Sequence, residues 1–445
     1  MKNEKNIARY ALEYALKKGC QQASVLLSTG EENEVEVRDG RVDRLHHSGG
    51  CQLSLNLFVD GAYSTISTNR LERNEIERFI DKGIIGTRFL AKDPYRSLPE
   101  KEMYYQGEMN DFGLYDAGFR NIDVDEKIEV AKRIFEEITD DRLQITDDSL
   151  SAGKVISAIS AIADTETYNY LIDSNGFEGE KSRTLFISTS QVSVMGEDDE
   201  RPEDYCYANA QHWDKLRKEG VGAEALQRAV AKIGASRIDS GVYSVVVDRR
   251  VASQLVNPLM SAIRGEALHM KSSFLLDKKG EKIASDRLTI VDNPRQYGVA
   301  GARLFDNEGI AVVGMPIVEN GVLKNYYISN YMSRKMGVQM TQGASTILDF
   351  ALGCYDTAEL IRCMGNGVYI TDFNGGNCNG TTGDFSYGIE GFWVENGVIV
   401  KPVSGMLMTG NMLKLWNNLV DTSNDPLGYT TRKVPSLMFA DVVVN

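Results

Sequence analysis

The sequence predicts an α+β protein, with amino-terminal helix and antiparallel-sheet domains followed by a mostly β, barrel-like carboxyl-terminal domain. Three observations support this prediction. Apolar residues recur at helical spacing near the amino terminus, two Asp-Gly pairs are flanked by alternating apolar and polar residues, and the chain beyond Phe274 is rich in strand segments separated by glycine turns. At 445 residues the chain can bury two or three cores. We expect domains at 1–110, 111–237 and 238–445.

The first domain combines two helices with a set of hairpins. Residues 6–17 carry an apolar stripe on one helical face, which is typical of a helix packed on a core. Strand segments follow and turn at the Asp-Gly pairs 39–40 and 60–61. Each pair predicts a hairpin, because a two-residue type I′ turn needs φ > 0 at both central positions. A helix over residues 73–90 closes the unit.

The middle domain follows a stretch in which periodicity weakens. Residues 93–123 contain two prolines and no sustained pattern, which predicts a connecting loop. An amphipathic helix is expected at 124–138. Long antiparallel strands should then meet at a turn near residues 173–176, and another helix should end at Gly234.

The carboxyl-terminal domain starts with a buried strand at 243–248 that leads into a helical pattern. Asn257 and Pro258 interrupt that pattern. Proline clashes inside a helix but is favoured at its first position, so either a kink or a fresh helix is expected there. The closing segment 436–444 reads as a buried strand.

Composition limits the classes of function. The chain has 49 basic and 63 acidic residues and a formal charge of −14, which would repel phosphate backbones, so direct nucleic-acid binding is disfavoured. No window approaches the roughly 18 consecutive apolar residues of a membrane span. The charged amino-terminal stretch lacks the uninterrupted apolar core that is typical of a signal peptide, and the six cysteines form no C-x-x-C pair. We therefore expect a reduced, cytoplasmic protein.

Few residues offer catalytic chemistry. Glu266 and His269 stand at i and i+3, so in a helix they share a face and could supply a base with its partner or two metal ligands. A lone histidine on a helix is more often structural. Cys378 could be a nucleophile if His269 lay within reach, or could simply fill a turn.

The stretch from residue 373 to 400 is the second candidate site, and six glycines fall between residues 375 and 391. Glycine lets another backbone approach closely, while asparagine, threonine and aspartate offer donors and acceptors without selecting one substrate side chain. The stretch predicts either a substrate-binding loop or tight turns between barrel strands. The residues that we expect to bind substrate are Gly375, Gly376, Asn379, Thr381 and Asp384.

Several linked motifs resemble the TldD/TldE (PmbA) family, whose members have historically been described as modulators of DNA gyrase. The motifs, in order, are VDRRVASQLV, GEALHMKSSFLLD, VVGMPIVENG and TTGDFSYGIEGFWVENGVIVKPVSG. The similarity covers most of the chain and is strongest from about Ser240 onward. It implies a peptidase built from two paired subunits that acts on small or unfolded peptides.

The resemblance also implies where zinc would be bound. In the TldD branch a helix carries H-E-x-x-x-H, and a late cysteine completes the zinc site. On this sequence the two histidine positions fall on Gly265 and Met270, the glutamate falls on Glu266, and the late segment has no cysteine. The chain is thus similar to the metal-free TldE/PmbA branch, with zinc in a partner subunit.

The favoured hypothesis is a TldE/PmbA-like subunit of a cytoplasmic two-subunit metallopeptidase that binds no metal itself. Its partner would be a TldD-like zinc-bearing subunit, or a second copy in a homodimer, and its substrate a peptide. Extended peptide adding to an exposed strand edge would give sequence-tolerant affinity. The alternatives are a stand-alone hydrolase that uses Glu266, His269 or Cys378, and a non-enzymatic protein-binding modulator related to DNA gyrase.

Overall fold

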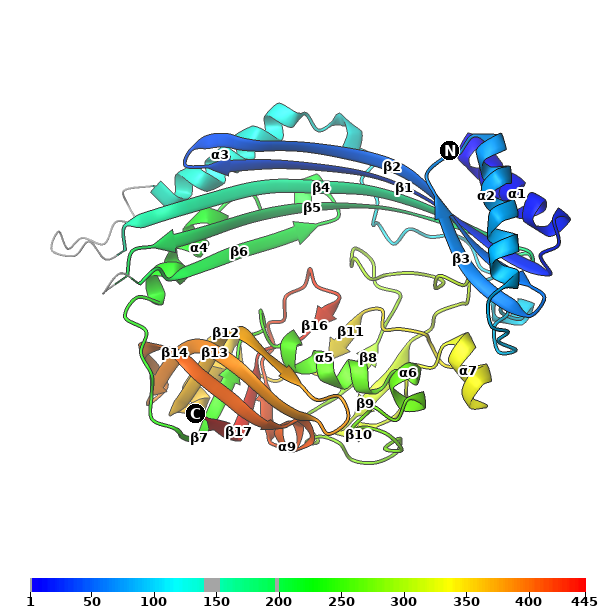
Figure 1. Ribbon diagram of the computed structural model, residues 1–445. Helices are drawn as coiled ribbons and strands as arrows, with labels where there is room; N and C mark the ends of the chain where they lie inside the picture. The colour runs from blue at the N-terminus through cyan, green and yellow to red at the C-terminus, as the bar shows by residue number, and fades with distance from the viewer. Residues whose placement is uncertain (1, 140–152, 197–199) are drawn as a thin grey trace.

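A long curved sheet arches over a β-rich carboxyl-terminal domain in the computed structural model, which describes residues 2–139, 153–196 and 200–445 (Figure 1). The sheet has six antiparallel strands in the order β3-β2-β1-β4-β5-β6. These strands are β1 (Gln22–Arg38), β2 (Arg41–Val59), β3 (Ala62–Thr68), β4 (Val155–Asp173), β5 (Glu178–Val194) and β6 (Glu203–Ala210). Strands β1 and β4 pair directly, so one sheet runs through both the first and the middle predicted domains.

Both predicted hairpins are confirmed. Asp39 and Gly40 join β1 to β2 with φ of 49° and 76°, and Asp60 and Gly61 join β2 to β3 with φ of 53° and 84°. All four angles are positive, as a type I′ turn requires.

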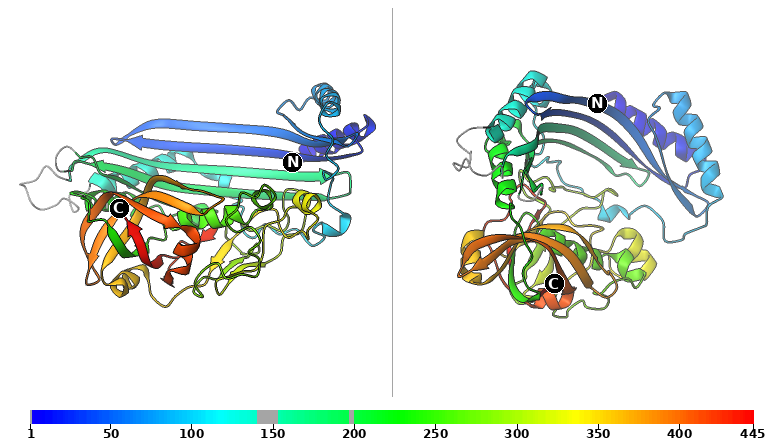
Figure 2. Two further views of the ribbon diagram at one scale, coloured as in Figure 1. Left: turned by 60° about the horizontal axis from the view of Figure 1, so that its bottom comes forward. Right: turned by 60° about the vertical axis from the view of Figure 1, so that its left-hand side comes forward.

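Four helices cover one face of the long sheet. They are α1 (Lys2–Lys17), α2 (Arg73–Arg88), α3 (Val124–Thr139) and α4 (Val221–Ala231). Val25 and Leu27 of β1 belong to the core under α1 and α2, and Val35 and Val37 belong to the core under α3 and α4. Because side chains alternate along a strand, these four residues point the same way. The helices therefore cover one face, and the other face looks toward the carboxyl-terminal domain (Figure 2).

The face toward the carboxyl-terminal domain is largely polar. Ser28 of β1 and Asn169 of β4 point to this side, and the serine hydroxyl donates to the Asn169 Oδ1 over 2.7 Å. Lys181 and Arg183 of β5 lie two residues apart on the same side, opposite to the buried Phe186. We call this surface the concave face.

The carboxyl-terminal domain contains a closed barrel and a second sheet, which confirms the predicted α+β class and barrel-like part. Barrel strands follow the order β14-β13-β12-β7-β17-β15, and a further pairing of β14 with β17 closes the ring. They are β7 (Gly241–Val247), β12 (Gly367–Cys378), β13 (Asp384–Glu395), β14 (Val398–Asn411), β15 (Leu419–Thr422) and β17 (Leu437–Val444). The second sheet contains β8 (Ile290–Asp292), β9 (Met315–Glu319), β10 (Val322–Leu323), β11 (Leu348–Phe350) and β16 (Arg432–Lys433).

Five short helices complete this domain: α5 (Ser253–Ala262), α6 (Gly265–His269), α7 (Asn330–Met336), α8 (Thr357–Met364) and α9 (Met412–Asn417). Helix α5 continues through Pro258, so a fresh helix starting there was the wrong alternative. The predicted connecting loop at 93–123 holds only the 3₁₀ turns Lys101–Met103 and Phe119–Asn121, and another such turn covers Trp213–Lys215. Within the described residues, no helix is both long and apolar enough to cross a membrane.

Close packing of α3 on α4 gives a test of this arrangement. A β-carbon at Gly222 of α4 would lie 2.0 Å from the main-chain oxygen of Ile134 in α3. Gly222→Ala should therefore destabilise the protein by about 1–3 kcal/mol, measured by urea unfolding. Gly86→Ala in α2 is the matched control, because an added β-carbon there meets nothing within 4 Å. That change should be neutral or stabilising by about 0.5–1 kcal/mol. Equal effects at both sites would contradict the packing.

Candidate functional site

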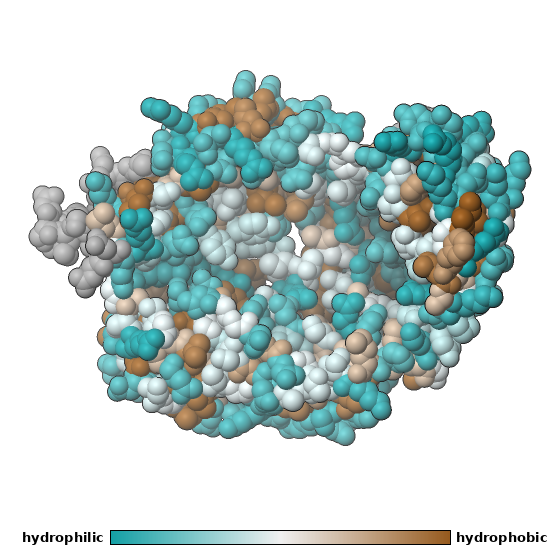
Figure 3. All heavy atoms as spheres, viewed as in Figure 1, coloured by the Kyte–Doolittle hydropathy of each residue, from teal (hydrophilic) through white to brown (hydrophobic). Residues whose placement is uncertain are grey.

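A recess separates the concave face from the carboxyl-terminal domain, and its mouth is visible on the surface (Figure 3). Two cavities lie there, of about 900 Å³ and about 510 Å³. Each is lined by residues of the long sheet and of the carboxyl-terminal domain. Cavities of this size can hold a small ligand or a few residues of a peptide.

Helix α6 presents two of the predicted catalytic residues to solvent. Glu266 and His269 lie on this helix, which fulfils the helical condition for a shared face. Both are exposed, and Glu266 forms a 3.6 Å ion pair with Arg264. Such an exposed pair is largely screened by water.

The donor set around α6 does not fit a zinc ion. Gly265 is buried, and a β-carbon there would lie 3.0 Å from the Met332 Cβ and 3.4 Å from the Ile328 Cδ1. Met270 is 74% exposed, and its thioether is a poor ligand for zinc. Zinc sites need at least three protein ligands. Among the residues that the structure describes, no three His, Cys, Asp or Glu side chains converge.

The glycine-rich stretch lies directly against the segment that follows α6. It comprises the end of β12, the loop 379–383 and the start of β13. The Phe274 N–H donates to the Gly380 carbonyl over 2.8 Å, and a β-carbon at Gly383 would lie 3.2 Å from the Phe274 ring. The loop therefore lies close to α6, as expected.

The polar residues of the loop bond mainly to one another. Asn379 Oδ1 accepts from the Thr381 N–H at 2.9 Å, and Asp384 accepts from the Thr382 hydroxyl at 2.7 Å. These bonds hold the turn and lower the pKa of Asp384, with the hydrogen bond from Asn411 as the largest cause. Since Asn379, Thr381 and Asp384 remain exposed, their side chains can still form hydrogen bonds with a ligand.

Two glycines of the loop region have different roles. Gly376 sits at a bulge of β12 with φ of 105°, and a β-carbon there would lie 2.1 Å from the Ser386 carbonyl oxygen. Only glycine fits that position. Gly375, with φ of 108°, has open space around it, so it requires glycine for its backbone angle alone.

Cys378 lacks the environment of a nucleophile. Burial raises the pKa of its thiol, and the carboxylate of Asp384 raises it further. Its Sγ lies 3.8 Å from the Asn379 carbonyl oxygen. The thiol therefore stays protonated at neutral pH, whereas a nucleophilic cysteine needs a cationic neighbour or a base. This disfavours a hydrolase that uses Cys378.

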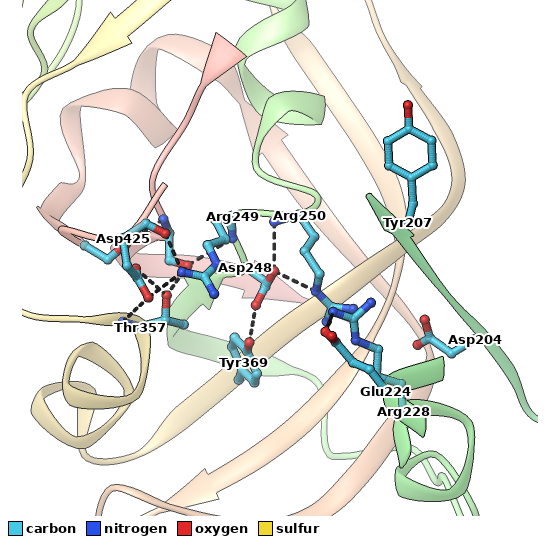
Figure 4. A network of polar contacts seen from close by, with 12 residues as sticks. Asp204, Tyr207, Glu224, Arg228, Asp248, Arg249, Arg250, Thr357, Tyr369 and Asp425 are labelled. Carbon is cyan, nitrogen blue, oxygen red and sulfur yellow. Dashed lines mark hydrogen bonds and ion pairs between the residues drawn. The ribbon is translucent and has the colours of Figure 1, made fainter. Parts of the chain in front are cut away.

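The larger cavity contains a polar network that the sequence analysis did not single out as a site. Asp248 follows β7, is buried, and accepts from the Arg250 Nε at 2.9 Å and from the Tyr369 hydroxyl (Figure 4). The neighbouring Arg249 pairs with Asp425 at 2.6 Å. Burial raises the pKa of Tyr369, and the Asp248 charge adds to this, so the phenol keeps its proton. The run VDRR was the only sequence signal for this network.

Edge strand β6 forms the opposite wall of the larger cavity. Its alternate main-chain carbonyls at 203, 205 and 207 accept from the side chains of Lys232, Arg228 and Tyr429, at 3.1, 2.8 and 3.1 Å. Side chains that occupy an edge prevent further strand pairing. The expected addition of a peptide to an exposed strand edge therefore does not suit β6, and its Tyr205 and Tyr207 side chains remain the ligand-facing groups.

Comparison with known proteins gives this architecture a context. Three adjoining family profiles match residues 23–85, 118–233 and 240–445, and they describe domain 1, the central domain and the C-terminal domain of PmbA/TldA metallopeptidases. The metalloprotease PmbA of Escherichia coli O157:H7 is 27% identical over 409 residues, which cover 91% of this chain and 87% of that protein. The PmbA homologue of Haemophilus influenzae is also 27% identical, with coverage of 94% and 90%.

Solved structures agree with the profiles. A candidate modulator of DNA gyrase from Bacteroides thetaiotaomicron is 44% identical and superposes with a TM-score of 0.95 over 100% of this chain and 99% of that one. TldE from Thermococcus kodakarensis is 16% identical and shares the fold, with a TM-score of 0.83 over 98% and 99% of the two chains. With three consecutive domain profiles matched in order, the chain belongs to the PmbA/TldD metallopeptidase family.

Proposed function

We propose that this chain is the PmbA/TldE-like, metal-free subunit of a two-subunit peptidase that acts on small or unfolded peptides. Relatives named metalloprotease PmbA support the peptidase activity. The observation that carries the subunit role is the packing of Gly265 against Met332, in the position where the zinc-binding branch has a histidine. A chain without zinc ligands needs a partner to supply the metal, and a TldD-like subunit is the partner that we propose.

The recess suits an extended peptide. Its concave face carries hydroxyl and amide side chains, and the glycine-rich loop lies next to the segment that follows α6 in the carboxyl-terminal domain. Such groups bind main-chain N–H and C=O without selecting a side chain. The role of Glu266 and His269 would then be to face peptide or partner from the exposed surface of α6, and Gly375, Gly376, Asn379, Thr381 and Asp384 would contact the peptide.

Zinc content tests the subunit role. The chain purified alone should contain far less than one zinc per chain by elemental analysis, because the described part of the chain offers no set of three ligands. The double variant Gly265→His and Met270→His should still bind no stoichiometric zinc, since a third ligand is missing and the new side chain at 265 meets Met332. One zinc per wild-type chain, lost on His269→Ala, would refute the proposal.

The loop is tested by a pair of substitutions in the chain co-expressed with its TldD-like partner. Thr381 is exposed, so Thr381→Trp should leave thermal unfolding unchanged and lower the peptidase rate about tenfold or more by blocking the peptide path. Gly383 has φ of 81° and contacts Phe274, so Gly383→Ala should lower the unfolding temperature. A Thr381→Trp pair that cleaves peptide at the wild-type rate would exclude the loop from the path.

A further inference from the structure

The smaller cavity on the concave side holds a cluster of three cations. Lys181 and Arg183 reach it from β5, and Arg303 reaches it from the carboxyl-terminal domain. The connecting loop at 109–115 forms a third wall. The cavity has a volume of about 510 Å³ and lies apart from the network around Asp248, with which it shares no lining residue.

The three cations bond to uncharged acceptors. Lys181 Nζ donates to the Phe305 carbonyl over 2.7 Å and lies 4.0 Å from the centroid of that residue's ring. Arg183 and Arg303 donate to four other main-chain carbonyls, at distances from 2.9 to 3.4 Å. The Arg303 Nε is buried without a hydrogen-bond partner. In the part of the chain that the structure describes, no ion pair within 4.0 Å neutralises any of the three.

Three carboxylates near the cluster leave part of its charge uncompensated. Asp292 acts on Arg303, but it also accepts hydrogen bonds from Tyr327 and Thr346, and burial raises its pKa. Asp306 accepts from the N–H groups of Glu308 and Ile310, and burial raises its pKa, which weakens it as a counter-charge. Glu180 points to the other side of β5 and pairs with Lys5 at 2.8 Å. The cavity therefore carries an excess of positive charge that is partly shielded from water, and an anion would be stabilised there.

We propose that this cavity binds the free C-terminal carboxylate of a short peptide. Guanidinium groups bind a planar carboxylate through paired N–H donors, and the ammonium group adds a third contact. Apolar lining at Phe112, Leu114 and Phe305 can receive the terminal side chain. The identity of the ligand as a peptide rests on the proposed function, whereas the preference for a carboxylate rests on the cavity alone.

Lys181 makes the binding pH-dependent. Burial, together with the charges of Arg183 and Arg303, lowers the pKa of Lys181 to about 7, and Asp306 opposes this shift. A bound carboxylate favours the protonated amine, so binding should take up a proton when the pH is near or above 7. Affinity should be constant below the pKa of the free lysine and fall as pH rises through it. The charged and titratable groups around Lys181 are Asp111, Tyr115, Arg183 and Arg303 in the cavity lining and Asp306 and Asp292 behind it, whereas the Glu180 carboxylate lies on the other side of β5.

Calorimetric titration of the isolated chain tests the carboxylate site. The probes are acetyl-trialanine with a free C-terminus and the same peptide as its amide; acetylation removes the titratable amino group. The acid should bind at least about tenfold more tightly than the amide, and Arg183→Gln should abolish that preference. Thermal unfolding of Arg183→Gln checks its fold. Equal binding of acid and amide, or binding of inorganic phosphate with no binding of the acid, would overturn the proposal.

Substitution of Lys181 isolates the titrating group. Between pH 6 and pH 8.5 the wild-type affinity for the acid should fall about tenfold, because the lysine loses its charge. Lys181→Arg keeps a fixed charge and should bind with little pH dependence. A pH dependence that persists in Lys181→Arg would contradict the role of Lys181. Because neither titration needs a partner or turnover, binding without peptidase activity in any pairing would refute the proposed function and leave the site intact.

Discussion

Strict alternation of side chains along the strands of the long sheet is the constraint on which the rest of the structure depends. Strands β2 and β4 each extend over 19 residues. Where these strands lie under the helices, every second residue must suit the helices on one face, and every other residue must suit the recess on the other. A slip of β5 by one residue would turn Lys181 and Arg183 toward the helices. The same slip of β1 would turn Val35 and Val37 away from them. The register therefore fixes the core and the concave face together.

The carboxyl-terminal barrel gives the recess its opposite wall. Pairing of β14 with β17 closes the ring, so the edges of these strands are not open to other chains. The hairpin from β12 to β13 then extends its glycine-rich turn to the segment after α6, where the Phe274 N–H bonds the Gly380 carbonyl. Rigid strands thus hold a loop whose exposed residues are free to contact a ligand.

Local signals in the sequence predicted the parts of the fold that local physics decides. The Asp-Gly turns need φ > 0, which few residues tolerate, so residues 39–40 and 60–61 could be placed from sequence. Closure of the barrel and the direct pairing of β1 with β4 could not be predicted from the sequence, because they join segments that are far apart in the chain. At Pro258 the sequence left a kink and a fresh helix open, and the structure excludes the fresh helix because α5 continues through the proline.

The candidate site divides in the same way. The sequence shows that position 265 is a glycine and not a histidine. Only the structure shows that this glycine packs against Met332, which leaves little space for a side chain. Alternation along β5 puts Lys181 and Arg183 on the same face of the sheet. Arg303 lines the same cavity but is more than one hundred residues later in the sequence. A periodic pattern in the sequence cannot predict such a long-range contact. The Asp248 network likewise needs Tyr369 from a distant strand.

Peptidase assays on defined pairings test the central claim most directly. The chain should be mixed with a TldD-like subunit in wild-type form and with one whose zinc-binding histidines are changed to alanine, and cleavage of an unfolded peptide should be followed. We predict cleavage only with the wild-type partner, because residues 2–139, 153–196 and 200–445 of this chain bring no three metal donors together. Cleavage by this chain alone, or by its pair with the zinc-deficient partner, would contradict the account.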